Sequence, residues 1–124
     1  MGYLLVFLGG GIGAVFRHGI NRASLAYLGP DFPYGTMIVN VVGGLLMGVV
    51  AETFLIRTGI SQEARLFITT GVLGGFTTFS AFSLDAALLW ERSDYGPLAV
   101  YVTGSVLLSI AALFAGMAAV RWLA

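Results

Sequence analysis

The sequence predicts an all-α membrane protein with four transmembrane helices in a single domain, residues 1–124. Two features of composition indicate this class: 58% of the residues are hydrophobic and only 10% are charged, far from a soluble average. The distribution of the apolar residues along the chain also indicates it. A helix needs roughly 20 mostly apolar residues to cross a bilayer, and the chain offers about four such stretches. We place the helices at Tyr3–Tyr27, Tyr34–Arg57, Ala64–Trp90 and Gly96–Leu123.

The first helix is expected to stay in the mature protein, since no basic residue precedes "YLLVFLGGG" and no small-residue cleavage site follows it. Gly9, Gly11 and Ala14 fit a dinucleotide-binding fingerprint, but the alternating strands and helices that this motif needs are missing. Gly9 and Gly13 are better interpreted as a G-x-x-x-G face that lets two helices approach closely in lipid.

The second helix follows a loop, "LGPDFPYG", whose Gly and Pro residues mark a turn. Thr36, Asn40 and Gly44 are spaced by four and share one face. Asn40 lies inside an apolar run, where a polar side chain either bonds to a neighbouring helix or serves a function. Gly44 and Gly48 repeat the close-packing spacing of the first helix.

The third helix contains "GVLGGFTTFSAFS", with Ser61 as its expected N-cap. Gly71, Gly74 and Gly75 are predicted to let the helix unwind near the midplane of the bilayer. Non-helical backbone is tolerated at that depth only when it is buried in protein or lines a cavity. The freed carbonyls could hold a cation.

Phe79 and Phe82 follow the predicted break and project from one face of the helix. The edge of a phenyl ring is electropositive, so inward-facing edges offer an anion weak contacts without a fixed charge. Alone, the pair indicates core packing. The hydroxyl residues around it, Thr77, Thr78, Ser80 and Ser83, favour the anion-contact interpretation.

The fourth helix is expected to start after the link "ERSDYGP", with Gly96 and Pro97 closing the turn. Tyr101, Ser105 and Ser109 are spaced by four, so one face carries a ladder of hydroxyls. A single serine in a membrane helix often bonds only to its own backbone, but three aligned hydroxyls suggest a lined pathway. The donors are neutral, unlike the rings of charged side chains in many ion pores.

The arginines predict no preferred orientation in the membrane. Three of the six fall toward the side of the N-terminus and three toward the other side, and lysine is absent. Copies could insert both ways, which makes an antiparallel, dual-topology homodimer a natural assembly. The alternative is a weak preference for one orientation, if Arg17 or Arg65 lies deeper in the membrane than this count assumes. The first group is Arg57, Arg65 and Arg121, and the second is Arg17, Arg22 and Arg92.

Three blocks, "GGGIGAVFRH", "GTMIVNVVGGLLMG" and "GVLGGFTTFSAF", resemble the signature blocks of the CrcB/Fluc fluoride channels, over essentially the whole chain. The resemblance implies a four-helix subunit in an antiparallel homodimer with two pores. Two positions depart from the family pattern: His18, where Tyr is frequent, and Ala81, where Thr is common.

The resemblance also implies roles for individual residues. The pore-facing asparagine corresponds to Asn40, and the paired pore phenylalanines correspond to Phe79 and Phe82. A structural sodium ion on the dimer axis would be held by the backbone carbonyls of Gly74 and Thr77. Arg17 matches a structural basic residue of the first block. The other residues expected along the fluoride pathway are Thr78, Ser80, Tyr101, Ser105 and Ser109.

The resulting expectation is passive, fluoride-selective export through a multi-pass protein of a prokaryotic inner membrane, giving fluoride resistance. A small multidrug-resistance-type, proton-coupled transporter is the alternative, but it needs a carboxylate that is usually in the first helix, which has none. Glu52 and Asp85 lie in the second and third spans, toward their ends. An assembly protein without transport would need the glycine faces but not the hydroxyl ladder.

An enzyme is the weakest class. Cysteine is absent and His18 is the only histidine, which excludes disulfides, thiolate chemistry and a Cys/His metal site. No set of nucleophile, base and orienting group can be assembled from what remains. The formal net charge of zero also gives nucleic acid no electrostatic attraction.

Overall fold

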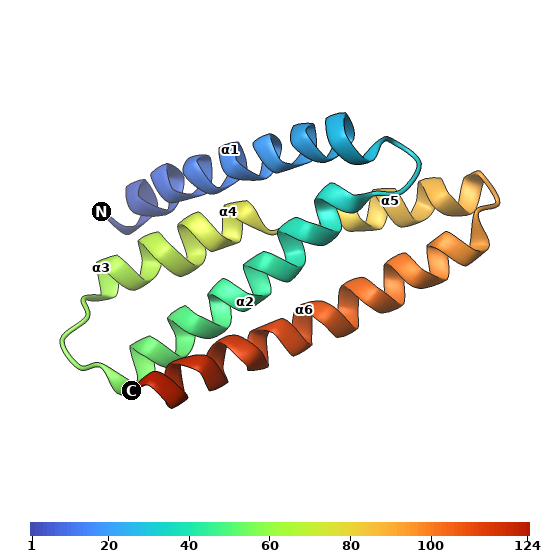
Figure 1. Cartoon of the computed structure of the whole chain (residues 1–124). Helices are drawn as coiled ribbons and strands as arrows, with labels where there is room; N and C mark the ends of the chain where they lie inside the picture. The colour runs from blue at the N-terminus through green and yellow to red at the C-terminus, as the bar shows by residue number, and fades with distance from the viewer.

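The computed structural model describes residues 1–124, and every regular element in it is a helix. Four helical spans run alongside one another (Figure 1), and each is long and apolar enough to cross a membrane. The predicted all-helical fold with four spans is therefore confirmed. The elements are α1 (Gly2–Leu28), α2 (Tyr34–Ile56), α3 (Gln62–Arg65), the π-helix η1 (Leu66–Leu73), α4 (Gly74–Phe76), α5 (Phe79–Glu91) and α6 (Tyr95–Leu123).

The ends of the spans lie within two residues of their predicted positions. The third span begins at Gln62 because Ser61 caps it: the Ser61 hydroxyl accepts a hydrogen bond of 3.1 Å from the Ala64 amide, as predicted. The predicted turn at Gly96 and Pro97 is wrong, since α6 already begins at Tyr95. Proline fits the first turn of a helix, where its missing N–H removes no hydrogen bond.

The first and third spans touch through their backbones, as the glycine spacing predicts. A methyl group at Gly9 would lie 2.7 Å from the carbonyl oxygen of Phe67 and 2.9 Å from the Cα of Gly71. One at Gly13 would overlap the carbonyl oxygen of Val72. Any side chain at these positions would push α1 away from the third span.

The second and fourth spans pack in the same way. A methyl group at Gly44 would lie 2.6 Å from the carbonyl oxygen of Ser109, and one at Gly48 would overlap that of Leu113. From the other side, Gly116 meets the carbonyl of Leu45. These contacts fix the position of α6 along the axis of α2.

The third span changes conformation at its centre. Thr77 (φ −82°, ψ 158°) and Thr78 (φ −153°, ψ 124°) have extended backbone and separate α4 from α5. The prediction that Gly71, Gly74 and Gly75 unwind the helix is wrong: Gly71 lies in η1 and the other two in α4. Gly71 and Gly75 instead provide the close contact with α1.

Large apolar side chains cover the outside of the bundle. Aromatic residues gather at both of its ends, with Tyr3 and Trp122 at one and Tyr27, Trp90 and Tyr95 at the other, all more than half exposed. Bands of Tyr and Trp are typical of the two interfaces between membrane and water. The surface is therefore suited to lipid over the length of the spans.

Candidate functional site

A reciprocal pair of hydrogen bonds joins α2 to the extended residues of the third span. The Asn40 side-chain amide donates to the carbonyl oxygen of Thr78 over 3.0 Å, and its oxygen accepts from the Thr78 N–H over 2.9 Å. Asn40 therefore satisfies both backbone groups of a residue that has left the helix, as low-polarity surroundings require. One of its two amide N–H groups has no partner in this pair.

Thr78 also starts the next helix. Its hydroxyl accepts a hydrogen bond of 3.1 Å from the Ala81 amide, which makes it the N-cap of α5. This cap sets the direction of the phenylalanines that follow. The Phe79 ring is 77% exposed in the single chain and lies 5.5 Å, centre to centre, from the half-buried Phe82 ring.

On α6, the hydroxyls of Ser105 and Ser109 are buried and have no hydrogen-bond partner. A serine or threonine in a membrane helix usually bonds to the carbonyl four residues earlier. Four hydroxyls in this chain do so, those of Thr53, Thr69, Thr77 and Ser83. The two α6 serines differ because their hydroxyls are the buried side-chain groups without any partner, so they need one from elsewhere.

These groups meet in one cleft of about 340 Å³ between α2, the third span and α6. Both polar and apolar residues line the cleft, and none of them carries a charge. Its lining consists of Asn40, Thr77, Thr78, Phe79, Phe82, Ser105, Val106, Ser109 and Ile110.

Two residues expected along the pathway, Tyr101 and Ser80, do not line this cleft. Tyr101 is fully buried, and its hydroxyl donates to Asp85 over 3.0 Å, while its ring packs 5.2 Å from that of Phe82. Ser80 is exposed, and its hydroxyl lies 3.3 Å from that of Thr78. Of the predicted ladder of three hydroxyl residues, two therefore line the cleft, Ser105 and Ser109.

A second cavity, of about 350 Å³, lies at the end of the bundle where α1 and α5 finish. Asp85 and Arg92 are on its wall, as is Ala81, one of the two departures from the family pattern. The other departure, His18, is exposed on α1. Charged groups thus occur in this outer cavity and are absent from the central cleft.

Arg17 reaches from α1 to the centre of the third span. Its Nε donates to the carbonyl oxygen of Gly75 over 3.1 Å, just before the extended residues. Its charge therefore lies beside the middle of the bundle rather than in a loop. The carbonyl oxygens of Gly74 and Thr77, expected to hold a cation, take part in none of the backbone bonds outside the helices and in no side-chain bond.

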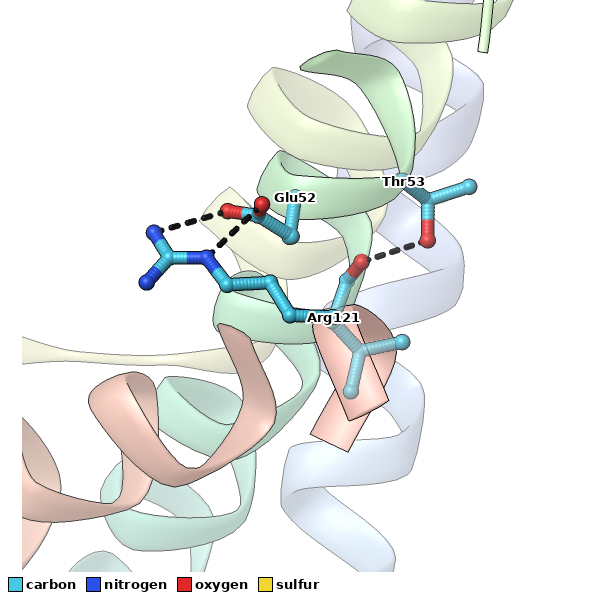
Figure 2. Close-up of polar contacts among 4 residues, drawn as sticks. Glu52, Thr53 and Arg121 are labelled. Atoms are coloured by element: carbon cyan, nitrogen blue, oxygen red, sulfur yellow. Dashed lines mark hydrogen bonds and ion pairs between the residues drawn. The ribbon is translucent and has the colours of Figure 1, made fainter. Parts of the chain in front are cut away.

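An ion pair lies at the other end of α2 (Figure 2). The buried carboxylate of Glu52 accepts two hydrogen bonds from Arg121, 2.9 Å from Nε and 3.2 Å from Nη2. The pair connects α2 to the last turn of α6. Sequence reasoning placed Glu52 toward the end of the second span but identified no partner for it.

Three residues of the cleft were not predicted as pathway residues: Thr77, Val106 and Ile110. Val106 and Ile110 each follow a predicted serine by one position, so helical geometry places them beside the hydroxyl face. An apolar residue on an apolar helix carries no signal of its own, and only the position of the serines could have revealed these two.

Comparison with known proteins gives a consistent result. Residues 4–117 match the family model described as CrcB-like protein, Camphor Resistance (CrcB). The chain is 61% identical over 121 residues to the fluoride-specific ion channel FluC of Rhodopseudomonas palustris strain BisB5, covering 98% of each chain. It is 53% identical over 123 residues to fluoride-specific ion channel FluC 2 of Nitrobacter hamburgensis, covering 99% of each.

Proposed function

Because the chain belongs to the CrcB family, we propose that the cleft between α2, the third span and α6 is a section of a fluoride pathway. The protein is a fluoride-specific ion channel, a multi-pass membrane protein and not an enzyme. One observation carries the placement of the pathway: Ser105 and Ser109, whose buried hydroxyls have no partner, both line a cleft that has no charged residue in its wall.

The chemistry of the cleft suits fluoride. Fluoride is small and a strong hydrogen-bond acceptor, so a pathway must replace the donors of its hydration water. The serine hydroxyls, the free N–H of Asn40 and the edges of the Phe79 and Phe82 rings are such donors. Conduction also requires release, and neutral donors hold an anion less tightly than a fixed cation would. Fluoride then moves passively down its electrochemical gradient, which exports it and gives resistance.

The functional unit is an antiparallel, dual-topology homodimer with its third helices interrupted near the midplane of the lipid bilayer. Support comes from charge: with Arg17 directed at Gly75, three arginines remain near one end of the bundle and two near the other, almost an even balance. The chain has no cysteine, so a single one introduced at Thr58 can be labelled selectively. An impermeant maleimide should label about half of the copies from outside, if insertion is unbiased.

The backbone carbonyls of Gly74 and Thr77 would hold a sodium ion at the dimer axis. Carbonyl oxygens are ligands for hard cations, and no group of three His, Cys, Asp or Glu side chains offers another metal site. Its role would be structural: its charge would attract the negative ends of the carbonyl dipoles where two chains meet. Replacing sodium with N-methylglucamine should lower the melting temperature of the dimer, and an unchanged value would remove the ion from the proposal.

The test of the pathway is fluoride efflux from liposomes containing purified protein, followed with a fluoride electrode. The double variant Ser105→Ala, Ser109→Ala should release fluoride far more slowly than the wild type. Ser83→Ala is the matched control, because its hydroxyl is bonded to the Phe79 carbonyl and lies outside the cleft. Efflux that is equally fast in the double variant and the control would place the pathway elsewhere.

A further inference from the structure

The side of α6 that faces the cleft carries two parallel strips. One is the pair of unpartnered hydroxyls of Ser105 and Ser109, and the other consists of Val106 and Ile110, one position further along in each case. Both strips have a spacing of four residues, so both follow the helix axis. We call Val106 and Ile110 the apolar strip.

The apolar strip differs from the rest of the α6 surface. Val106 and Ile110 are 45% and 53% exposed in the single chain, but both line the cleft. Leu107 and Phe114 on the same helix are more exposed and do not line it. The strip therefore lies at the edge of the cleft, where its bulk limits the space beside the hydroxyls.

Both residues of the strip are β-branched. In a helix, Val and Ile populate one χ1 rotamer almost exclusively, so their methyl groups form a wall that does not swing aside. Leucine, with more freedom, would give a softer wall. The stiffness matters because a hydroxyl can also donate to chloride, although the bond is weaker than that to fluoride, so the donors of the cleft do not exclude the larger ion by themselves.

We propose that Val106 and Ile110 set the width of the anion pathway beside the serine hydroxyls and thereby exclude chloride. This inference rests on the proposed function of the cleft and names the residues that determine its specificity. The hydroxyls supply attraction, and the apolar strip supplies the size limit.

The experiment compares chloride efflux with fluoride efflux in liposomes for the wild type, Val106→Ala and Ile110→Ala. One methylene in an apolar pocket is worth about 10-fold or more in discrimination, and these variants remove two and three carbons, so each should raise the chloride-to-fluoride ratio at least about tenfold. Val100→Ala is the matched control, since Val100 is 60% exposed on the same helix and does not line the cleft. Its ratio should remain that of the wild type.

Val106→Thr separates width from polarity, because threonine keeps the shape of valine and adds a hydroxyl. A wild-type ratio in this variant supports a size limit. If Val106→Thr releases chloride as fast as Val106→Ala does, the apolar character of the strip and not its width excludes chloride, and the proposal is overturned. Chloride exclusion in both alanine variants would also overturn it. If an alanine variant does not assemble, Ile110→Val should show a smaller rise. Wild-type protein that releases no fluoride would refute the proposed function itself, a separate result.

Discussion

Replacing Asn40 with alanine should destabilise the protein and slow fluoride efflux. The substitution removes the two bonds, of 3.0 and 2.9 Å, that satisfy the N–H and C=O of Thr78. A buried polar group left without a partner costs about 1–3 kcal/mol. Since Asn40 and Thr78 are only half-buried, we take the lower part of that range for each group, a total of about 2–4 kcal/mol.

The assay is denaturant-induced unfolding of the purified protein in detergent, together with liposome efflux. Asn21→Ala is the control, because it deletes the same atoms from a half-buried side chain that makes no hydrogen bond. Efflux should fall in Asn40→Ala because Thr78 caps α5 and so directs the Phe79 ring. If Asn40→Ala unfolds at the same denaturant concentration as Asn21→Ala, the bridge does not hold the third span as described.

Three further changes test the packing and the pathway. Gly13→Ala should lower stability by about 1–3 kcal/mol through overpacking against the third span, whereas Gly11→Ala, with nothing within 4 Å, should be neutral or slightly stabilising; equal melting temperatures would contradict the close contact. Arg121→Ala strands a buried carboxylate and should lower the melting temperature more than Arg57→Ala, whose guanidinium makes no ion pair. Phe82→Ile keeps apolar bulk but removes ring edges, so fluoride efflux should drop while gel filtration still shows the assembled protein; unchanged flux would remove the aromatic contribution.

The features that could be predicted from the sequence are those encoded in local pattern. Apolar length predicts the four spans, and Ser61 predicts a cap because its side chain needs only the amide three residues later. The glycine pairs predict backbone contact because lipid offers no other reason for repeated small residues at spacing four. Each of these depends on a few neighbouring residues.

The features that could not be predicted depend on partners distant in the chain. Glycine tolerates unwinding but does not require it, so the sequence could not tell that Gly71 and Gly75 remain helical against α1 while Thr77 and Thr78 become extended. The extended backbone of Thr78 is stabilised by hydrogen bonds with Asn40, which lies 38 positions away in the chain. Tyr101 was expected to offer its hydroxyl to the pathway, but Asp85 accepts that bond.

The distribution of charge explains how a channel with arginines in its spans can still release an anion. Arg17 is the guanidinium closest to the middle of the bundle, and it bonds to the Gly75 carbonyl instead of lining the cleft. Arg92 lies in the outer cavity, and Arg121 is paired with Glu52. On the proposed pathway, an anion therefore leaves charged surroundings before it reaches the serines and then meets only neutral donors. Unpaired hydroxyls are costly in a packed helix, and the proposal accounts for them because a passing ion can satisfy them without being trapped.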